Sequence, residues 1–187
     1  VVPALAVFRQ QHPQLHIHLS TSSTHADLIS ERFDVAIRLG RMLDSNLRAV
    51  QLSTFEIFAV AAPELVGRFA AVDTLAALES LPTLGHGRVP ELAVTDPSGA
   101  EHLYQPKPGT TAIVADNSAA LRAFALSGQG VAILPQWLVQ EDLNAGRLTR
   151  LLADHGFARQ GVYALYPDTR HLPLKVRAFI DFMKGWG

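Results

Sequence analysis

Two clusters of hydroxyl and amide side chains stand where an expected strand gives way to an expected helix. Ser22, Ser23 and Thr24 form the first cluster, and Asn117 with Ser118 forms the second. Hydroxyl groups and the free N–H groups of a helix start can hold an anion, because the helix dipole favours negative charge there. The same residue types are also the usual N-caps of helices. Each cluster is therefore either part of an anion site or an ordinary helix cap.

Two basic side chains stand beside apolar segments. Arg38 closes the run 33–37, and a charge at the end of a buried strand is unusual. It either pairs with a local acid or points toward a carboxylate ligand, and its position at the carboxyl end of the strand makes it a candidate for the edge of a pocket. His86 follows the segment 82–85, and it either lines a cleft or lies in a solvated loop.

The remaining motifs argue against catalysis and metal binding. His16 and His18 share one strand face, but no third ligand has a recognisable spacing and no His-Glu-x-x-His occurs. The Gly-Gln-Gly run at 128–130 lies between a helix and a strand, the reverse of the dinucleotide-binding order, so we interpret it as a cap and turn. No Gly-x-Ser-x-Gly motif and no arguable pair of catalytic carboxylates is present. We therefore expect no catalytic residue, no metal and no cofactor.

The composition is that of a folded protein without a strongly charged surface. The 187 residues are 48% hydrophobic and 18% charged, which favours a globular chain over a disordered one. Lys and Arg (16) nearly balance Asp and Glu (17), so no surface that coats nucleic acid is indicated. No apolar run approaches the ~18 residues that span a bilayer, and no signal-peptide pattern opens the sequence. Cysteine is absent, which excludes disulfides and thiolate chemistry.

The elements that must position these residues alternate along the chain. Strict alternation over 15–19 predicts a half-buried strand, and the apolar run 33–37 predicts a strand covered on both faces. Further strands are expected over 47–52, 56–61, 81–85, 111–116, 131–135 and 162–166, with hairpins and loops over 89–110. Helices are expected over 2–10, after Thr24, from Pro63, from Asp73, from Asn117 to Gly128, over 137–144 and through 176–183. Strands that alternate with helices predict parallel α/β sheets with helices on both faces.

Several motifs follow one another in order over nearly the whole chain. They are Phe8-Arg9-Gln10-Gln11-His12-Pro13, Asp27-Leu28-Ile29, Phe33-Asp34-Val35-Ala36-Ile37-Arg38-Leu39-Gly40, Asp116-Asn117-Ser118 running to Ala125, Gly128-Gln129-Gly130-Val131-Ala132-Ile133-Leu134-Pro135, Gly146-Arg147-Leu148 with Leu151-Leu152, and Tyr163-Ala164-Leu165-Tyr166-Pro167. Together they resemble the effector-binding domain of LysR-type bacterial transcriptional regulators.

The resemblance implies an α/β fold of two Rossmann-like lobes joined by two crossover strands, like a type II periplasmic binding protein, with the ligand cleft between the lobes. Lobe one is expected to comprise residues 1–80 and 167–187, and lobe two residues 81–166. Ligands of open α/β sheets bind beyond the carboxyl ends of the strands, where the helices begin. The ligand contacts predicted on this basis are Ser22, Ser23, Thr24, Arg38, Gly85, His86, Asn117, Ser118 and Pro135.

Two parts of the family pattern are not found in this sequence. One is the N-terminal winged helix-turn-helix with its linker helix, through which we expect the full regulator to contact DNA. The other is the first strand of lobe one, so we expect part of the pocket to lie outside this numbering. The resemblance also implies a homodimer or tetramer that forms through this domain, a cytoplasmic location, no membrane, and a contact with RNA polymerase.

Three functions fit the sequence to different degrees. The first is a sensing domain whose small-molecule effector changes how attached DNA-binding domains sit on DNA. Hydroxyl, amide and arginine side chains at helix starts suit a small organic acid as that effector. The second function is a periplasmic solute-binding protein of the same fold, and the third is a small enzyme on the same scaffold. We predict the first, because the family motifs are ordered and specific and no acid-base or nucleophile set supports an enzyme.

Overall fold

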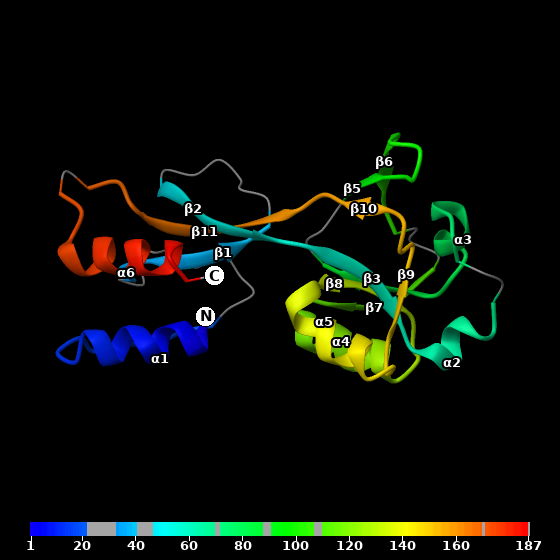
Figure 1. Ribbon diagram of the computed structural model, residues 1–187, viewed down its shortest axis with the longest axis horizontal. Coiled ribbons are helices and arrows are strands. Elements are labelled where there is room, and N and C mark those ends of the chain that lie inside the picture. The colour runs from blue at the N-terminus through cyan, green and yellow to red at the C-terminus, as the bar shows by residue number, and fades with distance from the viewer. Residues whose placement is uncertain are drawn as a thin grey trace. The chain divides into compact units, whose positions relative to one another are not determined.

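The computed structural model of the protein describes residues 1–21, 33–40, 47–69, 72–87, 91–106, 110–169 and 171–186 (Figure 1). The chain forms two compact units: unit 1 is Val1–Thr54 with Gln160–Gly187, and unit 2 is Phe55–Arg159. This division differs from the expected one, because residues 55–80 belong to unit 2 and residues 160–166 to unit 1. The difference comes from strand pairing, since the strand at Ile57–Ala61 is hydrogen-bonded between two strands of the second unit.

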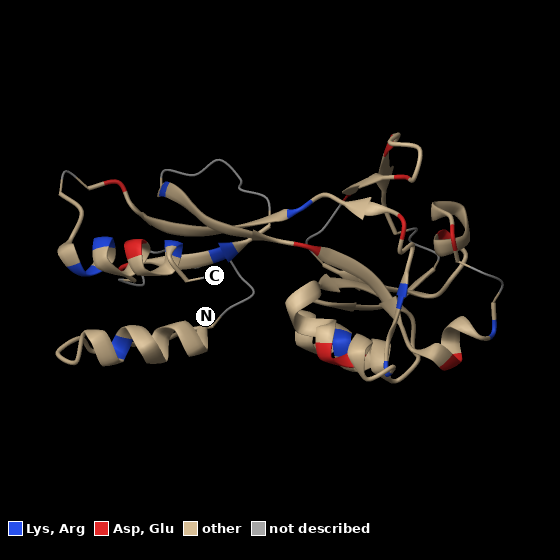
Figure 2. Cartoon of the chain, in the orientation of Figure 1, with Lys and Arg blue, Asp and Glu red and all other residues tan. Residues whose placement is uncertain are grey.

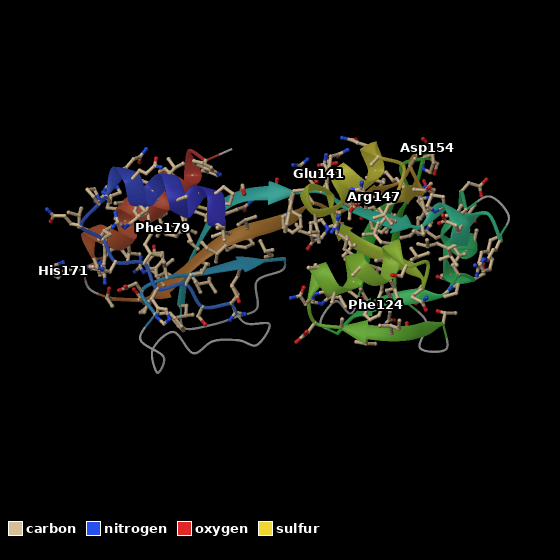
Figure 3. The ribbon with its side chains drawn as sticks, turned by 90° about the horizontal axis from the view of Figure 1, so that it is seen from below. Phe124, Glu141, Arg147, Asp154, His171 and Phe179 are labelled. Atoms are coloured by element: carbon tan, nitrogen blue, oxygen red, sulfur yellow. The ribbon has the colours of Figure 1, made fainter. Side chains whose placement is uncertain are left out.

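Unit 1 is a small sheet that packs with two helices. Its strands β1 (Ala36–Leu39), β11 (Gln160–Pro167) and β2 (Leu47–Phe55) lie in the order β1-β11-β2, and β1 runs antiparallel to β11. The helices are α1 (Val2–Gln11) and α6 (Leu174–Lys184). The ring of Phe179 on α6, labelled in Figure 3, meets the ring of Phe8 on α1 edge to face, with 5.4 Å between their centroids. Burial at Val176, Phe179, Ile180 and Met183 confirms the apolar stripe that the sequence predicts for α6.

Unit 2 contains a five-stranded sheet with the order β7-β4-β8-β3-β9. These strands are β7 (Thr111–Ala115), β4 (Thr83–His86), β8 (Val131–Pro135), β3 (Ile57–Ala61) and β9 (Thr149–Leu151). Strand β4 lies between β7 and β8 and is parallel to both, whereas β3 is antiparallel to β8 and β9. The sheet is therefore mixed: the expectation of parallel strands is confirmed for the pairs of β4 with β7 and β8 and is wrong for the pairs of β3 with β8 and β9. Alternation of strands with helices does not set the direction of β3, which follows β2 without an intervening helix.

The two faces of this sheet are covered by different elements. Side chains alternate along β3, so Ala59 and Ala61 face one core cluster while Phe58 and Val60 face the other. The second face carries α4 (Ser118–Leu126) and α5 (Gln136–Asn144), as Figure 1 shows. The first face is covered by α2 (Pro63–Val66), α3 (Leu75–Glu79) and a small sheet of β10 (Gly156–Phe157), β5 (Leu92–Thr95) and β6 (Glu101–Tyr104).

Most other expected elements appear close to their expected positions. The β5–β6 hairpin falls in the segment predicted to hold hairpins, and Gly128 and Gly146 end α4 and α5 with φ values of 69° and 66°. The predicted strand over 15–19 is wrong, because these residues pair with no described strand and His16 and His18 are exposed. A strand needs a neighbour for its N–H and C=O groups, so alternation alone is insufficient. The helix expected after Thr24 lies outside the described residues.

Candidate ligand-binding edge of unit 2

The three parallel strands of unit 2 end at one edge of the sheet. His86 is the last residue of β4 and pairs in register with Ala115, the last residue of β7. The chain continues from β7 into α4 and from β8 into α5 at this edge. We call the segments His86–Gly87, Asp116–Ser118 and Pro135–Gln136 the parallel edge. Open α/β sheets bind ligands at such an edge, because helix starts and strand ends present their free polar groups there.

The centre of the parallel edge depends on close packing between β4 and β7. Gly85 is buried, and a Cβ atom at this position would lie 2.9 Å from Cγ2 of Thr111 and 3.3 Å from Cγ2 of Val114. The hydroxyl groups of Thr83 and Thr111 are 3.0 Å apart and join the two strands at their other end. His86 is half-buried at the end of β4, so it closes a strand and does not lie in a solvated loop. The absence of a side chain at Gly85 therefore allows β4 and β7 to pack closely, and His86 lies at the parallel edge itself.

The start of α4 satisfies its own amides. The side-chain oxygen of Asn117 accepts hydrogen bonds from the backbone N–H of Ala119 at 2.8 Å and of Ala120 at 3.3 Å. These are two of the four N–H groups that a helix leaves without an intrahelical partner. The capping interpretation of Asn117 is therefore confirmed, although an additional contact between Asn117 and a ligand stays a prediction. Ser118 follows as the first helical residue and is half-buried.

The start of α5 is built differently. Pro135 ends β8 and occupies the N-cap position, where it has no side-chain oxygen, and no described side chain caps the helix. The N–H of Gln136 donates to the carbonyl of Glu56 over 2.9 Å. The next amides, those of Trp137 and Leu138, belong to the first turn and so have no intrahelical acceptor. The open helix start at the parallel edge therefore belongs to α5.

A buried carboxylate joins the two helices that start at this edge. Asp142 of α5 is fully buried, and it accepts hydrogen bonds from Arg122 of α4 at 2.5 and 2.8 Å and from Arg147 at 2.7 and 2.9 Å. Figure 3 shows Arg147 close to the carboxyl-terminal part of α5. Burial alone would raise the pKa of Asp142, but the hydrogen bonds from Arg122 and Arg147 hold this pKa below its usual value. The carboxylate is therefore ionised at neutral pH and fixes α4 against α5.

The other predicted contacts belong to unit 1 or lie outside the described residues. Arg38 is half-buried in unit 1, where it pairs in register with Tyr163 of β11. Ser22, Ser23 and Thr24 lie outside the described residues. The sequence reasoning did not single out Gln136 and Trp137, of which Trp137 is 60% exposed. The available signal was the Pro-Gln-Trp sequence after a buried strand, because it opens a helix without any capping residue type.

Several kinds of site are absent from the part of the chain that the structure describes. No group of three or more His, Cys, Asp and Glu side chains comes together there to hold a metal ion. No described helix is long and apolar enough to cross a membrane. Lys and Arg side chains are interspersed with Asp and Glu in each unit (Figure 2). The described residues therefore present neither a metal centre nor a purely cationic element of the kind that binds phosphate backbones.

Comparison with known proteins gives a consistent result. The family model for the LysR substrate binding domain matches residues 1–187. The chain is 32% identical over 183 residues to the HTH-type transcriptional regulator PtxR of Pseudomonas aeruginosa, covering 96% of this chain and 57% of PtxR. It is 28% identical to CrgA of Neisseria meningitidis, covering 98% of this chain and 61% of CrgA. The chain thus spans less than two thirds of the length of these relatives.

Solved structures of the same kind superimpose on the chain. The regulatory domain of CrgA from Neisseria meningitidis matches with a TM-score of 0.80 and 28% identity over 99% of this chain and 90% of that one. Full-length AphB, a virulence activator of Vibrio cholerae, matches with a TM-score of 0.81 and 25% identity over 100% of this chain and 63% of AphB. PtxR and CrgA are named as transcriptional regulators, and AphB is named as a virulence activator.

The two-unit α/β fold and the parallel edge define a protein of the periplasmic-binding-protein class. Within that class, the chain belongs to the LysR substrate-binding domain family, the effector-binding domain of LysR-type transcriptional regulators.

Proposed function

We propose that this chain senses a small-molecule effector through the parallel edge of unit 2 and thereby modulates transcription by the regulator to which it belongs. The observation that carries the proposal is the open start of α5 beside the carboxyl ends of three parallel strands. Amides of a helix start are donors that cost no reorganisation when an acceptor arrives. Family membership supports the same role.

The effector class that best fits this edge is a small organic acid. A carboxylate would accept from the first-turn amides of α5 and gain from the positive end of that helix. The hydroxyl of Ser118 and the imidazole of His86 are further polar groups at the edge. The proposed contacts are Gly85, His86, Asn117, Ser118 and Pro135 from unit 2, with Arg38, Ser22, Ser23 and Thr24 as proposed contacts from unit 1.

The regulatory consequence extends beyond this chain. We propose that an N-terminal winged helix-turn-helix of the full regulator contacts DNA in the cytoplasm, with RNA polymerase as a further partner. We also propose that the domain assembles as a homodimer or tetramer. Val114 on the outermost strand β7 is 63% exposed and Phe124 on α4 is 38% exposed, so apolar surface is available for such an assembly. Sedimentation of the chain over a range of concentrations tests this assembly.

A thermal-unfolding screen tests the proposed effector class. Each small carboxylic acid is paired with the amide that has the same body, so that only the charge differs. An effector at ~100 times its Kd stabilises the fold by about 2.7 kcal/mol, which raises the midpoint of unfolding. We expect acids to raise it and the matched amides to leave it unchanged. A screen in which only neutral compounds raise the midpoint would contradict the assignment of an acid.

A pair of serine variants on α4 locates the effector. Ser118→Ala removes the hydroxyl at the parallel edge, and we expect it to weaken the effector identified in the screen. Ser127→Ala removes a hydroxyl at the other end of the same helix, where it donates to the carbonyl of Ala123. This control should bind the effector with unchanged affinity. Equal losses in both variants would show that the effect is on the helix and not on ligand contact.

A further inference from the structure

Arg150 is a cation that no described residue neutralises. It lies on β9 and is half-buried, and none of its nitrogen atoms forms a hydrogen bond or ion pair with a described side chain. Three other arginines of unit 2 do have carboxylate partners: Arg122 and Arg147 pair with Asp142, and Arg159 pairs with Glu56. A half-buried guanidinium without an acid partner keeps its five N–H donors for another acceptor.

The face of this guanidinium is fixed by an aromatic ring. The central carbon of the guanidinium is 3.9 Å from the centroid of the Phe58 ring. Phe58 is only 6% exposed and belongs to the core beneath α4 and α5, so the ring is held in place. Stacking on a ring engages the face of the guanidinium and leaves the N–H groups at its edge directed outward. Arg150 is therefore preorganised for an acceptor that approaches in the plane of the guanidinium.

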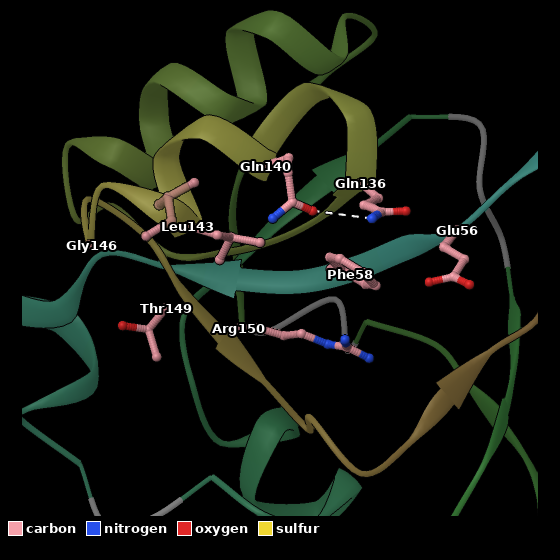
Figure 4. Close-up of a pocket in the computed structure, with 9 residues that line it drawn as sticks. Glu56, Phe58, Gln136, Gln140, Leu143, Gly146, Thr149 and Arg150 are labelled. Carbon is pink, nitrogen blue, oxygen red and sulfur yellow. Dashed lines mark hydrogen bonds between the residues drawn. The ribbon is translucent and has the colours of Figure 1, made fainter. Parts of the chain in front are cut away.

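A cavity lies beside Arg150. It has a volume of about 670 Å³, and its walls come from α5, β3, β9 and the turn that follows α5. In Figure 4 the guanidinium of Arg150 reaches toward the part of the cavity where Glu56, Phe58 and Gln136 lie. The volume falls in the range of ~300–1,000 Å³ that is usual for small-molecule sites.

Two amide side chains add donors on the opposite wall. Gln136 donates to the side-chain oxygen of Gln140 at 3.1 Å (Figure 4). Gln140 in turn donates to the side-chain oxygen of Asn144 at 2.9 Å. Each amide NH₂ has two hydrogens, so Gln136 and Gln140 each retain one N–H for a further acceptor. The chain of hydrogen bonds also fixes the direction of both side chains along α5.

The local charge favours an anion. Glu56 is the one acidic residue among those that line the cavity, and its carboxylate accepts from Arg159 at 2.9 Å. The charges of Glu56 and Arg159 cancel, so the net charge at the cavity is the single positive charge of Arg150. Leu143 and Leu148 add apolar surface beside the ring of Phe58. The cavity thus combines one positive charge and amide donors with an apolar wall.

We propose that this cavity is an accessory anion site that shares only Gln136 with the parallel edge and binds a small organic carboxylate through Arg150. The carboxylate accepts two parallel hydrogen bonds from the guanidinium, and Gln136 or Gln140 donates a further one. The apolar body of the ligand packs on Leu143 and Leu148. These walls favour an organic acid over inorganic phosphate, which has the same charge sign but no apolar part. The proposal uses neither β4 nor α4 and does not depend on the proposed function.

A titration followed by NMR locates the site on the unaltered chain. Benzoate, benzamide and inorganic phosphate are added separately to the ¹⁵N-labelled protein, and the backbone amide resonances are followed. We expect saturable shifts with benzoate at Gly146 and Thr149–Leu151, and none with benzamide. If benzoate shifts only the amides of Gly87 and Ser118–Ala120, it binds at the parallel edge and the accessory site is wrong. Absence of saturable shifts at millimolar benzoate would overturn it as well.

Two substitutions of Arg150 test the residue itself. Arg150→Gln should lower the benzoate affinity at least about tenfold, because charge-assisted bidentate hydrogen bonds are lost. Arg150→Lys keeps the charge but not the planar fork, so an intermediate loss is expected. Arg68→Gln makes the same change of charge at an exposed position of unit 2, and it should bind benzoate like the unaltered chain.

The variants also distinguish an organic carboxylate from an inorganic oxyanion as the ligand. If phosphate binds as tightly as benzoate and both are lost in Arg150→Gln, the site takes simple oxyanions and the assignment of an organic acid is wrong. If Arg150→Gln and Arg68→Gln weaken benzoate equally, only the overall charge matters and the site is wrong. Circular dichroism of each variant confirms that the fold is retained before affinities are compared.

Discussion

The helices α4 and α5 start at the same edge of one sheet, and each follows a strand parallel to β4, yet their first turns are completed differently. In α4 the side chain of Asn117 occupies two amides of the first turn, whereas Pro135 leaves the first turn of α5 without a side-chain acceptor. Asn117 therefore stabilises its helix within the protein itself. The start of α5 lacks that stabilisation and retains donors for a ligand. Position at the edge of a sheet is thus not enough to identify a binding residue.

Asp142 holds α4 and α5 side by side. Its substitution is therefore expected to have the largest effect on stability. Asp142→Asn keeps the size of the side chain but removes the charge that Arg122 and Arg147 share. We expect a loss of about 3 kcal/mol in the free energy of unfolding, because a buried hydrogen-bonded ion pair is broken from one side. Breaking a buried pair usually costs about 3–5 kcal/mol, and we expect the lower end because both arginines are partly exposed. Urea denaturation of the chain and its variant measures it.

Asp181→Asn is the matched control for this change. Asp181 lies in an exposed pair with Arg177 on α6, with 3.9 Å between the charged atoms. Exposed pairs of this kind contribute about 0–1 kcal/mol. If Asp142→Asn destabilises the chain no more than Asp181→Asn does, the Arg122–Asp142–Arg147 cluster does not join the helices.

The same carboxylate predicts a pH dependence. The folded-state pKa of Asp142 lies below its usual value, so its contribution to stability is complete above the unfolded-state pKa of about 3.9. That contribution is lost as the pH falls from there through the folded-state pKa. The difference in unfolding free energy between the chain and Asp142→Asn should therefore be constant from neutral pH to about pH 5 and shrink below it. A difference that grows toward acid pH would reverse the assigned sign.

Gly85→Ala tests how tightly the middle of the parallel edge is packed. The new Cβ atom would lie 2.9 Å from Cγ2 of Thr111, which is stiff in a strand, so β4 and β7 must move apart. We expect a loss of about 1–3 kcal/mol in thermal or urea unfolding. Gly87→Ala is the control, since its Cβ would meet Val114 at an ordinary 3.5 Å. Similar costs at both positions would mean that the close approach at Gly85 is unimportant.

Asn117→Ala removes the cap of α4 and should cost about 1 kcal/mol. Because Asn117 is also a proposed contact, we expect the affinity for the effector to fall as well. The affinity would stay unchanged if Asn117 only caps α4 and the amides of α5 hold the effector. Unfolding measurements give the first quantity, and calorimetric titration of the effector gives the second. A large loss of affinity together with a small loss of stability would show that Asn117 contacts the ligand directly.

Pro135→Ser makes α5 resemble α4 by offering a capping hydroxyl. The stabilisation from the new cap and the loss of the rigidity of proline are each of the order of 0.5–1 kcal/mol, so the net change in stability should be small. Effector affinity should fall several-fold, because the hydroxyl then occupies a first-turn amide. Unchanged affinity would indicate that the amides of α5 do not hold the effector. This is the smallest stability effect of the set, and it tests the comparison most directly.

Much of the fold could be predicted because local patterns agree with the final packing. The strand–helix–strand unit from β7 through α4 to β8 carries its own cap, apolar stripe and glycine stop, and it appears at the expected residues. The direction of β3 and the strand β9 could not be predicted, since both depend on partners far away in the sequence. The division between units was misplaced for the same reason. The change of pattern near Leu81 marks a new strand, but it does not mark a new unit.

The candidate site was predictable in part. Gly85, His86, Asn117, Ser118 and Pro135 were all predicted contacts, and the structure places them in or beside the parallel edge. The sequence could not decide whether the side-chain oxygen of Asn117 caps its own helix or contacts a ligand, because capping and anion binding need the same residue type. The stacking of Arg150 on Phe58 was invisible for a different reason. It joins side chains of two strands whose pairing is itself not local.

Unit 2 is one uninterrupted stretch of chain, whereas unit 1 is made of two stretches that flank it. The ends of unit 2 meet, because Arg159, its last residue, forms an ion pair with Glu56, its second residue. During synthesis from the N-terminus, unit 2 can therefore complete its sheet while β11 and α6 have not yet emerged. Unit 1 must wait for both of them. Residues 55–159 thus have the form of an inserted domain, and we expect them to fold cotranslationally as an independent body before the unit around them closes.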